Sequence, residues 1–505
     1  MNTPAVGSER TSKIVGYKIT KGNFQNTTSN LPQRIAILAE ANTAQQAGLS
    51  TDPYQILSAS EAGTKYGFGS PIYNIARILL PVFGDGVGGI PVFVYPQAAA
   101  GGSAARVQTI TVTGTATATG VHTLVVNGRS NLDGSSYDFS VVSGDTPTVI
   151  AGKIADALNN VLGAPATASP AVGVVTATTK WTGLTSQDVN FTVSNNGASL
   201  GVTYAVAQTV AGSGTPSVSA ALTSFGAVWN TIVINSYGTV TSVMDALEQY
   251  NGIPDPNNPT GRYAGIIMKP FIAITGSLLD NPTTVTDTRK LNVTLAIAPA
   301  PLSAGLPMEA AANMALLFAT VSQNTPHLDV SGRNYPDMPT PVSIGLMADY
   351  NNRDAFVKKG SSTVNLVAGV YQVCDFVTTY HPDGENPPQF RYCRNLNIDW
   401  NVRFSYYVLE QIHVVDHVIA ADNDIVTVDG VVKPKTWKQV LTSSLFADLT
   451  KRALTTDAGF SSGGLLVNLD TQNPDRLNTF FPYKRTGYLR IASTEAQAGF
   501  NFGAI

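Results

Sequence analysis

The chain has 505 residues, of which 13% are charged, and its formal net charge is −3. Proteins that hold nucleic acid by its phosphates need clustered lysines and arginines, so this charge argues against that class. The sequence starts without a basic segment followed by an apolar one, and no apolar run reaches the ~20 residues of a membrane span. We expect no secretory signal, no membrane insertion and a reducing cytoplasm, since Cys374 and Cys393 lack a CxxC spacing.

The first predicted element is a short strand near the start of the chain. Val15, Tyr17 and Ile19 alternate with other residues and therefore share one face of an extended segment. A polar, loop-like stretch follows up to residue 30. We expect residues 1–30 to form an N-terminal arm that pairs with a sheet in this chain or in another.

Strands and helices alternate in two separate stretches of the chain. The predicted strands are 35–39, 91–95, 231–235 and 291–297, and the predicted helices are 71–80, 240–250 and 308–321. This alternation is typical of an α/β sheet with parallel members. It predicts a discontinuous α/β core domain made of residues 31–100 and 216–380, within a multidomain chain of the α/β (α+β) class.

Residues 101–215 differ from both neighbouring stretches in composition. They are rich in alternating threonine and valine, which favours β-strands. The predicted strands are 108–113, 121–126, 137–142, 172–178, 189–193 and 202–206, with one helix over 149–161. Small residues at 98–103 and 211–216 indicate flexible linkers at both borders. We therefore expect a β-rich domain inserted into the core domain.

Two long helices are predicted in the last part of the chain, residues 381–505. The first runs from about residue 400 to 419 and the second from 436 to 454. The expected apolar face of the first is Trp400, Phe404, Tyr407, Val408, Ile412, Val415 and Ile419, and that of the second is Trp437, Val440, Leu441, Leu445 and Leu449.

Several apparent ligand-binding motifs fail on inspection. Residues 84–89 match GxGxxG, but a helix precedes them and a strand follows, which is the reverse of a dinucleotide fold. His413 and His417 have helical spacing for a metal, yet the glutamate of a zinc protease is replaced by Val414. The acidic residues without EF-hand spacing are Asp383, Glu385, Asp422, Asp424 and Asp429. We therefore predict no catalytic, cofactor-binding or metal-binding residue.

The chain closes on a second strand-forming arm. Leu489 and Ile491 alternate with polar residues, and Phe500 and Phe502 share one face of a further short segment. Such strands leave backbone groups unpaired unless a sheet receives them. Two arms of this kind predict a subunit that joins its neighbours by strand addition.

The C-terminal half also carries a family resemblance. The segments that carry it are 327–332, 352–360, 373–380, 391–398, the helix that follows, and 487–492. Their order and spacing resemble the tail sheath proteins of contractile-tailed bacteriophages of the Mu-like group. The resemblance extends over residues 30–100 and 216–505 and leaves out the threonine-rich insertion.

This resemblance implies a structural subunit of the virion, assembled in the cytoplasm of the bacterial host, with no enzymatic activity and no cofactor. Sheath subunits form a helical homopolymer around a tail tube, between baseplate and terminator proteins, and contract to drive the tube through the host envelope. From the independent composition and linker-like borders of 101–215 we expect an outer domain, and we expect 381–505 to be an inner one. The possible tube-facing residues are Lys435, Lys438, Lys451 and Arg452.

Two other classes of protein stay open at this point. A self-assembling surface protein or adhesin is suggested by the threonine-rich insertion, although such a protein needs a secretion signal. An α/β hydrolase-like enzyme is suggested by the core, although no GxSxG elbow or other site can be assembled from the sequence. Electron microscopy separates the three, since a sheath protein is expected to form hollow tubes.

Overall fold

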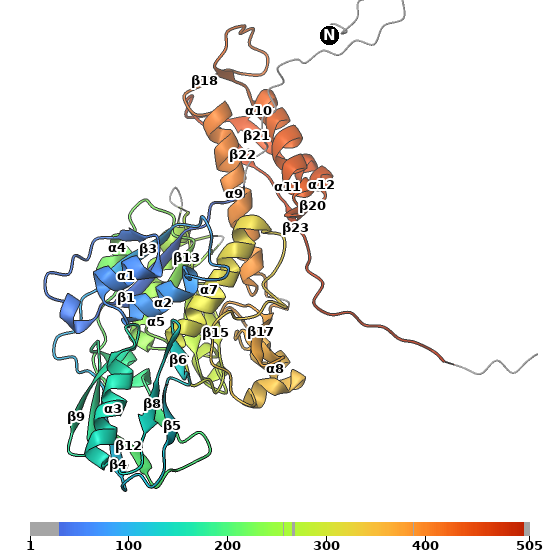
Figure 1. Cartoon of the computed structure of the whole chain (residues 1–505). Coiled ribbons are helices and arrows are strands. Elements are labelled where there is room, and N and C mark those ends of the chain that lie inside the picture. Colours follow the sequence, from blue (N-terminus) through green and yellow to red (C-terminus); the bar gives the residue numbers. More distant parts are fainter. Residues whose placement is uncertain (1–29, 256, 265–267, 387, 499–505) are drawn as a thin grey trace, which may run out of the picture. The chain divides into compact units, whose positions relative to one another are not determined.

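The computed structural model describes residues 30–498, apart from 256, 265–267 and 387, and its chain divides into two compact units (Figure 1). In the described part of the chain, the first unit consists of residues 30–404 and 485–498, and the second consists of residues 405–484. Helix α9 (Cys393–His413) contributes residues to both units. The predicted N-terminal strand with Val15, Tyr17 and Ile19 lies outside the described residues.

The first unit is built on a six-stranded sheet with the order β15-β14-β13-β1-β3-β2. All neighbours pair in parallel except β2, which is antiparallel to β3. The strands are β1 (Ile35–Glu40), β2 (Tyr54–Ile56), β3 (Val92–Gln97), β13 (Ile232–Asn235), β14 (Ile272–Ser277) and β15 (Leu295–Pro299). The predicted mixed α/β sheet is confirmed.

Helices cover both faces of this sheet, which is why its strands are almost continuously apolar. Side chains of β1 alternate between two cores, with Ile35 and Ile37 on one side and Ala36 and Leu38 on the other. The helices on the first side are α1 (Ala59–Tyr66), α2 (Pro71–Leu79) and α7 (Pro307–Asn324), and those on the second are α4 (Ser219–Thr223) and α5 (Thr241–Asn251).

Between β3 and α4 the chain forms helix α3 (Pro147–Asn159), two larger antiparallel sheets and the short antiparallel pair of β6 (Asn131–Leu132) and β7 (Ser135–Ser136), coloured green in Figure 1. One sheet has the order β12-β4-β10-β9 and the other β11-β5-β8. Their strands are β4 (Val107–Thr113), β5 (Gly120–Val126), β8 (Asp138–Val141), β9 (Ala166–Ala171), β10 (Val174–Thr179), β11 (Phe191–Ser194) and β12 (Thr203–Val210). Strand β9 was not predicted, because small residues and Pro170 hide an edge strand.

The borders of the insertion are not the flexible linkers that the sequence predicted. Ala104 and Ser213 exchange two backbone hydrogen bonds of 2.9 and 3.1 Å, so the two border segments pair with each other. The backbone N–H of Leu184 also donates to Gly214 at 2.7 Å. The small residues at these borders let the two backbones approach closely, and this close approach takes the place of the expected flexibility.

Helix α9 differs from its prediction at both ends. It begins at Cys393 and ends at His413, and Ile419 belongs instead to the short strand β18 (Val418–Ile419). Trp400 is buried and Phe404 and Val408 are half-buried, but Tyr407, Ile412 and Val415 are exposed, so the predicted apolar stripe is wrong at those three positions. The buried face carries polar residues, including Asn401, whose side chain accepts a hydrogen bond of 2.9 Å from the backbone of Leu31.

The second unit contains a helix that matches its prediction closely. It consists of α10 (Pro434–Val440), a π-helical segment (Leu441–Phe446) and α11 (Ala447–Lys451). In the predicted stripe, Val440 is half-buried and the other members, Trp437, Leu441, Leu445 and Leu449, are buried. Further elements are β19 (Val431–Val432), β20 (Thr455–Thr456), α12 (Ala458–Gly463), β21 (Leu466–Leu469) and β22 (Leu477–Phe480), and β23 (Lys484–Arg485) has one residue in each unit.

Candidate functional site

The C-terminal arm is held at its root by an ion-pair cluster in the first unit. The Arg490 guanidinium pairs with Asp329, in the loop after α7, and through Nη1 with Asp375 at 3.1 Å, at the end of β17 (Val370–Asp375). It also lies over the Tyr392 ring, 3.7 Å from the centroid. Burial raises the pKa of Asp375, and the Arg490 charge opposes that rise. We call these four residues the arm clamp.

Two further arginines fix the residues that lead to the clamp. The Arg485 guanidinium forms a fork with Asp399, with nitrogen–oxygen distances of 2.5 and 2.6 Å. From helix α9, Arg394 donates two hydrogen bonds of 2.9 Å to the carbonyl and the hydroxyl of Thr486. Bidentate contacts of this kind fix orientation as well as adding energy. Residues 485–490 are therefore attached to the first unit through the contacts of Arg485, Thr486 and Arg490.

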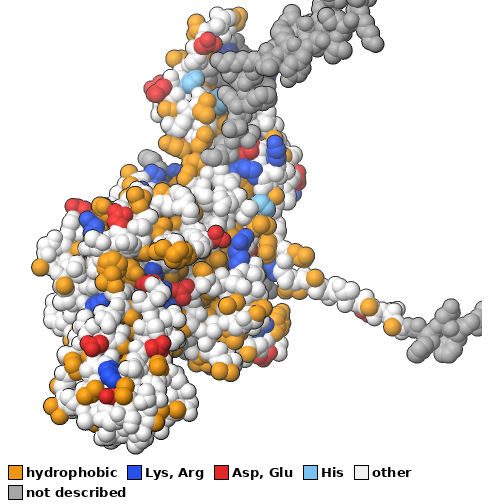
Figure 2. Space-filling view, in the orientation of Figure 1, with side chains coloured by type: hydrophobic (Ala, Val, Ile, Leu, Met, Phe, Trp, Pro, Cys, Tyr) orange, Lys and Arg blue, Asp and Glu red, His pale blue; other side chains and the backbone are white. Residues whose placement is uncertain are grey.

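Side chains on the other side of this segment are uncovered. Leu489 is 82% exposed and Ile491 is 76% exposed, whereas Arg490 between them points into the clamp. Figure 2 shows hydrophobic side chains along the described part of the arm. Within the described chain, residues 486–498 form no strand, so the predicted C-terminal strand does not form on its own subunit. Phe500 and Phe502 lie outside the described residues.

An open two-stranded hairpin lies in the second unit. Strands β21 and β22 pair only with each other among the described strands. Leu466 and Phe480 face each other across the hairpin and are 57% and 61% exposed. An isolated hairpin is marginally stable in water, and an apolar pair at its surface favours addition of further strands.

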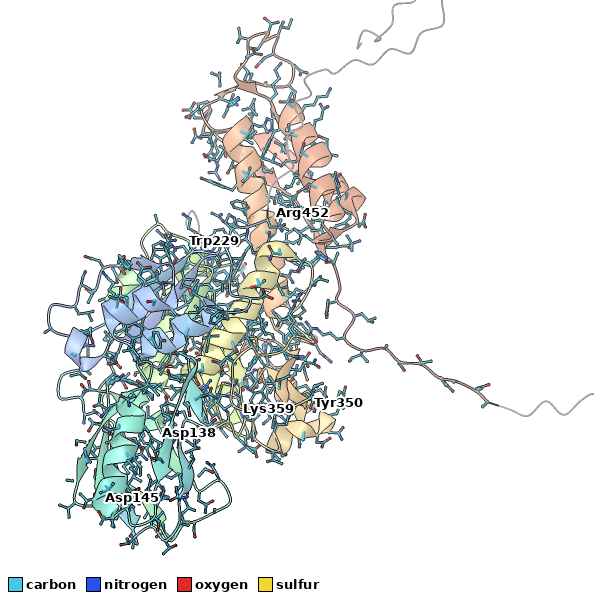
Figure 3. All side chains as sticks on the ribbon, in the orientation of Figure 1. Asp138, Asp145, Trp229, Tyr350, Lys359 and Arg452 are labelled. Carbon is cyan, nitrogen blue, oxygen red and sulfur yellow. The ribbon has the colours of Figure 1, made fainter. Side chains whose placement is uncertain are left out.

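The predicted tube-facing residues divide into two groups. Lys435, Lys438 and Lys451 are exposed on the helix from 434 to 451. The Arg452 guanidinium, labelled in Figure 3, instead pairs with Asp448 at 2.7 Å and donates to the Ser405 hydroxyl at 2.7 Å. Arg452 therefore has partners within its own unit, whereas its role toward a tube stays a prediction.

A buried charge cluster ties the inserted β-rich part to the core sheet. Glu309 of α7 pairs with Arg77 of α2 at 2.5 Å and with Arg129 of the insertion at 2.9 Å. Asp337 pairs with the same two arginines. Burial by itself raises the pKa of Glu309, but Arg129 and Arg77 outweigh it and hold the carboxyl ionised. Arg77, Arg129 and Asp337 line a cleft of about 820 Å³.

Among the described residues, no His, Cys, Asp or Glu side chains gather in a group of three or more that could hold a metal ion. Burial and the neighbouring His417 lower the pKa of His413. Asp422 and Asp424 accept backbone N–H groups at 2.8 Å, as loop-forming residues do. Within the described ranges, no helix is long and apolar enough to cross a membrane.

Comparison with known proteins agrees with the resemblance seen in the sequence. No protein-family model matches the chain. The Mu-like prophage FluMu tail sheath protein of Haemophilus influenzae is 24% identical over 458 residues, which are 86% of this chain and 87% of that protein. A solved sheath tail protein of Desulfitobacterium hafniense is 12% identical, with a TM-score of 0.46 over 94% of this chain and all of that one. The predicted relation to Mu-like tail sheath proteins is confirmed.

Proposed function

We propose that this relative of Mu-like tail sheath proteins is a subunit that polymerises around a phage tail tube and contracts to drive the tube through the host envelope. Its proposed partners are further copies of itself, the tube protein, and the baseplate and terminator proteins. Its proposed place is the virion, after assembly in the host cytoplasm. The similarity to a tail sheath protein over most of both chains supports this proposal.

The observation that carries the proposal is the uncovered arm. Leu489 and Ile491 present an apolar edge that the first unit leaves in water, and burying each such side chain is worth roughly 1.5–3 kcal/mol. Each backbone hydrogen bond of an added strand contributes about 0.5–1.5 kcal/mol net. A neighbouring copy that receives the arm therefore gains a linkage that tolerates rigid-body motion of the bodies.

The β21–β22 hairpin is the proposed receiver of the arm. Its two open edges provide backbone donors and acceptors, and the exposed pair of Leu466 and Phe480 provides an apolar surface. The N-terminal arm with Val15, Tyr17 and Ile19 is proposed to add to the same kind of edge. Four strands in one sheet are more stable than an isolated hairpin.

The inserted domain, residues 101–215, is proposed to lie on the outside of the polymer, and 381–505 to face the tube. The insertion forms its own sheets, so an outward position leaves the body contacts free to change between two states. Lys435, Lys438 and Lys451 remain the proposed contacts to an acidic tube surface.

The experiment is a matched pair of arm variants examined by electron microscopy. The double change Phe500→Asp with Phe502→Asp places charges on a face meant for burial, so we expect folded chains that no longer build tubes. Phe500→Leu with Phe502→Leu keeps the face apolar and should still give tubes. Normal tubes from the aspartate pair would refute the strand-addition role of the arm.

A further inference from the structure

The arm clamp is a buried ionic contact and not a surface ion pair. The Arg490 side chain is 16% exposed and that of Asp329 is 2% exposed. Surface ion pairs contribute little, but breaking a buried pair leaves an uncompensated charge in a poor solvent. The guanidinium is divided between carboxylates from two segments that are 161 and 115 residues away in the sequence. Release of Arg490 therefore carries a substantial cost.

The clamp also marks a change in how the arm is held. Before it, Arg485 is bound by Asp399, and Thr486 is bound by Arg394. After it, every described residue from Ile491 to Ala498 is exposed. Tyr488 and Arg490 are half-buried, whereas Leu489 and Ile491 are exposed. This alternation is typical of an extended segment, so the arm is already extended where it leaves the body.

We infer that Arg490 is the fixed joint of the arm, so that the segment handed to a second copy of this chain starts at Ile491. The inference rests on the proposed function, because it takes the second copy as the receiver. The 15 residues from 491 to 505 reach ~50 Å when extended. Tension on the exchanged strand enters the body through the Arg490 contacts with Asp329 and Asp375, which set where and in which direction the arm emerges.

Limited trypsin digestion of the full-length, unassembled chain tests this joint directly. Trypsin must take the arginine side chain into its own pocket, so cleavage after Arg490 requires the clamp to open. Arg476, whose side chain is 63% exposed, serves as the internal reference. We expect release of the 491–505 peptide, measured by mass spectrometry, to be at least tenfold slower than cleavage after Arg476.

A matched pair of variants separates the clamp from general effects. Asp375→Asn removes one carboxylate of the clamp and should accelerate cleavage after Arg490 at least tenfold. Asp383→Asn makes the same chemical change in an exposed pair with Lys290 and should leave that rate unchanged. Cleavage after Arg490 as fast as after Arg476 in the unaltered chain, or no acceleration in Asp375→Asn, would overturn the inference.

A third chain distinguishes failure of the joint from failure of the proposed function. A chain ending at Ser493 keeps the clamp but lacks most of the exchanged segment. We expect slow cleavage after Arg490 in this chain and no tubes in electron micrographs. Tubes together with slow cleavage would refute the role of the arm in assembly, whereas fast cleavage without tubes would refute the joint alone.

Discussion

Glu40→Gln is expected to remove a pH dependence from the stability of the first unit. Glu40 ends strand β1, is 2% exposed, and its Oε1 has no hydrogen-bond partner. Its Oε2 lies 2.9 Å from the position that a Cβ on Gly183 of the insertion would occupy. Burial raises the pKa of Glu40 from its ordinary value of 4.5 to about 8.

The sign and size of the effect follow from proton linkage. Because the folded state holds the proton more tightly than the unfolded state, this stabilisation is complete below pH 4.5 and is lost as the pH rises through 8. Each pH unit in that window is worth about 1.36 kcal/mol, so the loss between pH 5.5 and pH 8 is about 3 kcal/mol. Glutamine resembles the protonated acid and cannot ionise.

Urea denaturation of the unassembled chain at pH 5.5, 7 and 8.5 measures this directly. We expect the unfolding free energy of Glu40→Gln, relative to the unaltered chain, to rise by about 3 kcal/mol across the series. The same change at Glu495, which is exposed, should leave the profile unaltered. A constant difference between Glu40→Gln and the unaltered chain at all three pH values would refute the reasoning.

Glu309→Gln should lower the unfolding free energy by about 3 kcal/mol in urea titrations, because it leaves two buried guanidinium groups with one carboxylate; a loss below 0.5 kcal/mol would contradict this. Charge reversal at Lys438 and Lys451 should weaken co-sedimentation with tubes more as the salt concentration falls, and unchanged attachment at low salt would exclude this contact. Ser143→Cys, in an exposed turn of the insertion, should react with a maleimide equally fast in tubes and in free chains; protection in tubes would place the insertion inside.

Local patterns in the sequence predicted the core sheet well. The runs at 35–39 and 91–95 are apolar throughout and that at 231–235 is apolar between Thr231 and Asn235, because helices cover both faces of these strands. The prediction failed in α9, where the polar residues Asn397 and Asn401 lie on the buried face. They interrupt the helical spacing of apolar residues from which a buried face is predicted. An apolar pattern reports burial only where the buried residues are apolar.

The candidate site was predicted only in part. Alternation of Leu489 and Ile491 indicated an extended segment with one apolar face, which is a property of neighbouring residues. The arm clamp gave no such signal, since Asp329 and Asp375 are far from Arg490 in the sequence and only the fold brings them together. The prediction of flexible borders for the insertion failed for the same reason, because the two borders are far apart in the sequence and pair with each other only in the fold.

Because Ala104 pairs with Ser213, the insertion (residues 101–215) can be exchanged for another domain, and we call it a cassette for that reason. Its two ends leave the core sheet side by side, so any folded domain whose termini are adjacent can be grafted there without stretching the parallel strands. Replacement must also satisfy Glu309, which loses Arg129 when the cassette is exchanged. A polymer of such subunits would display one foreign domain at every lattice position, at a spacing fixed by the body and not by the guest.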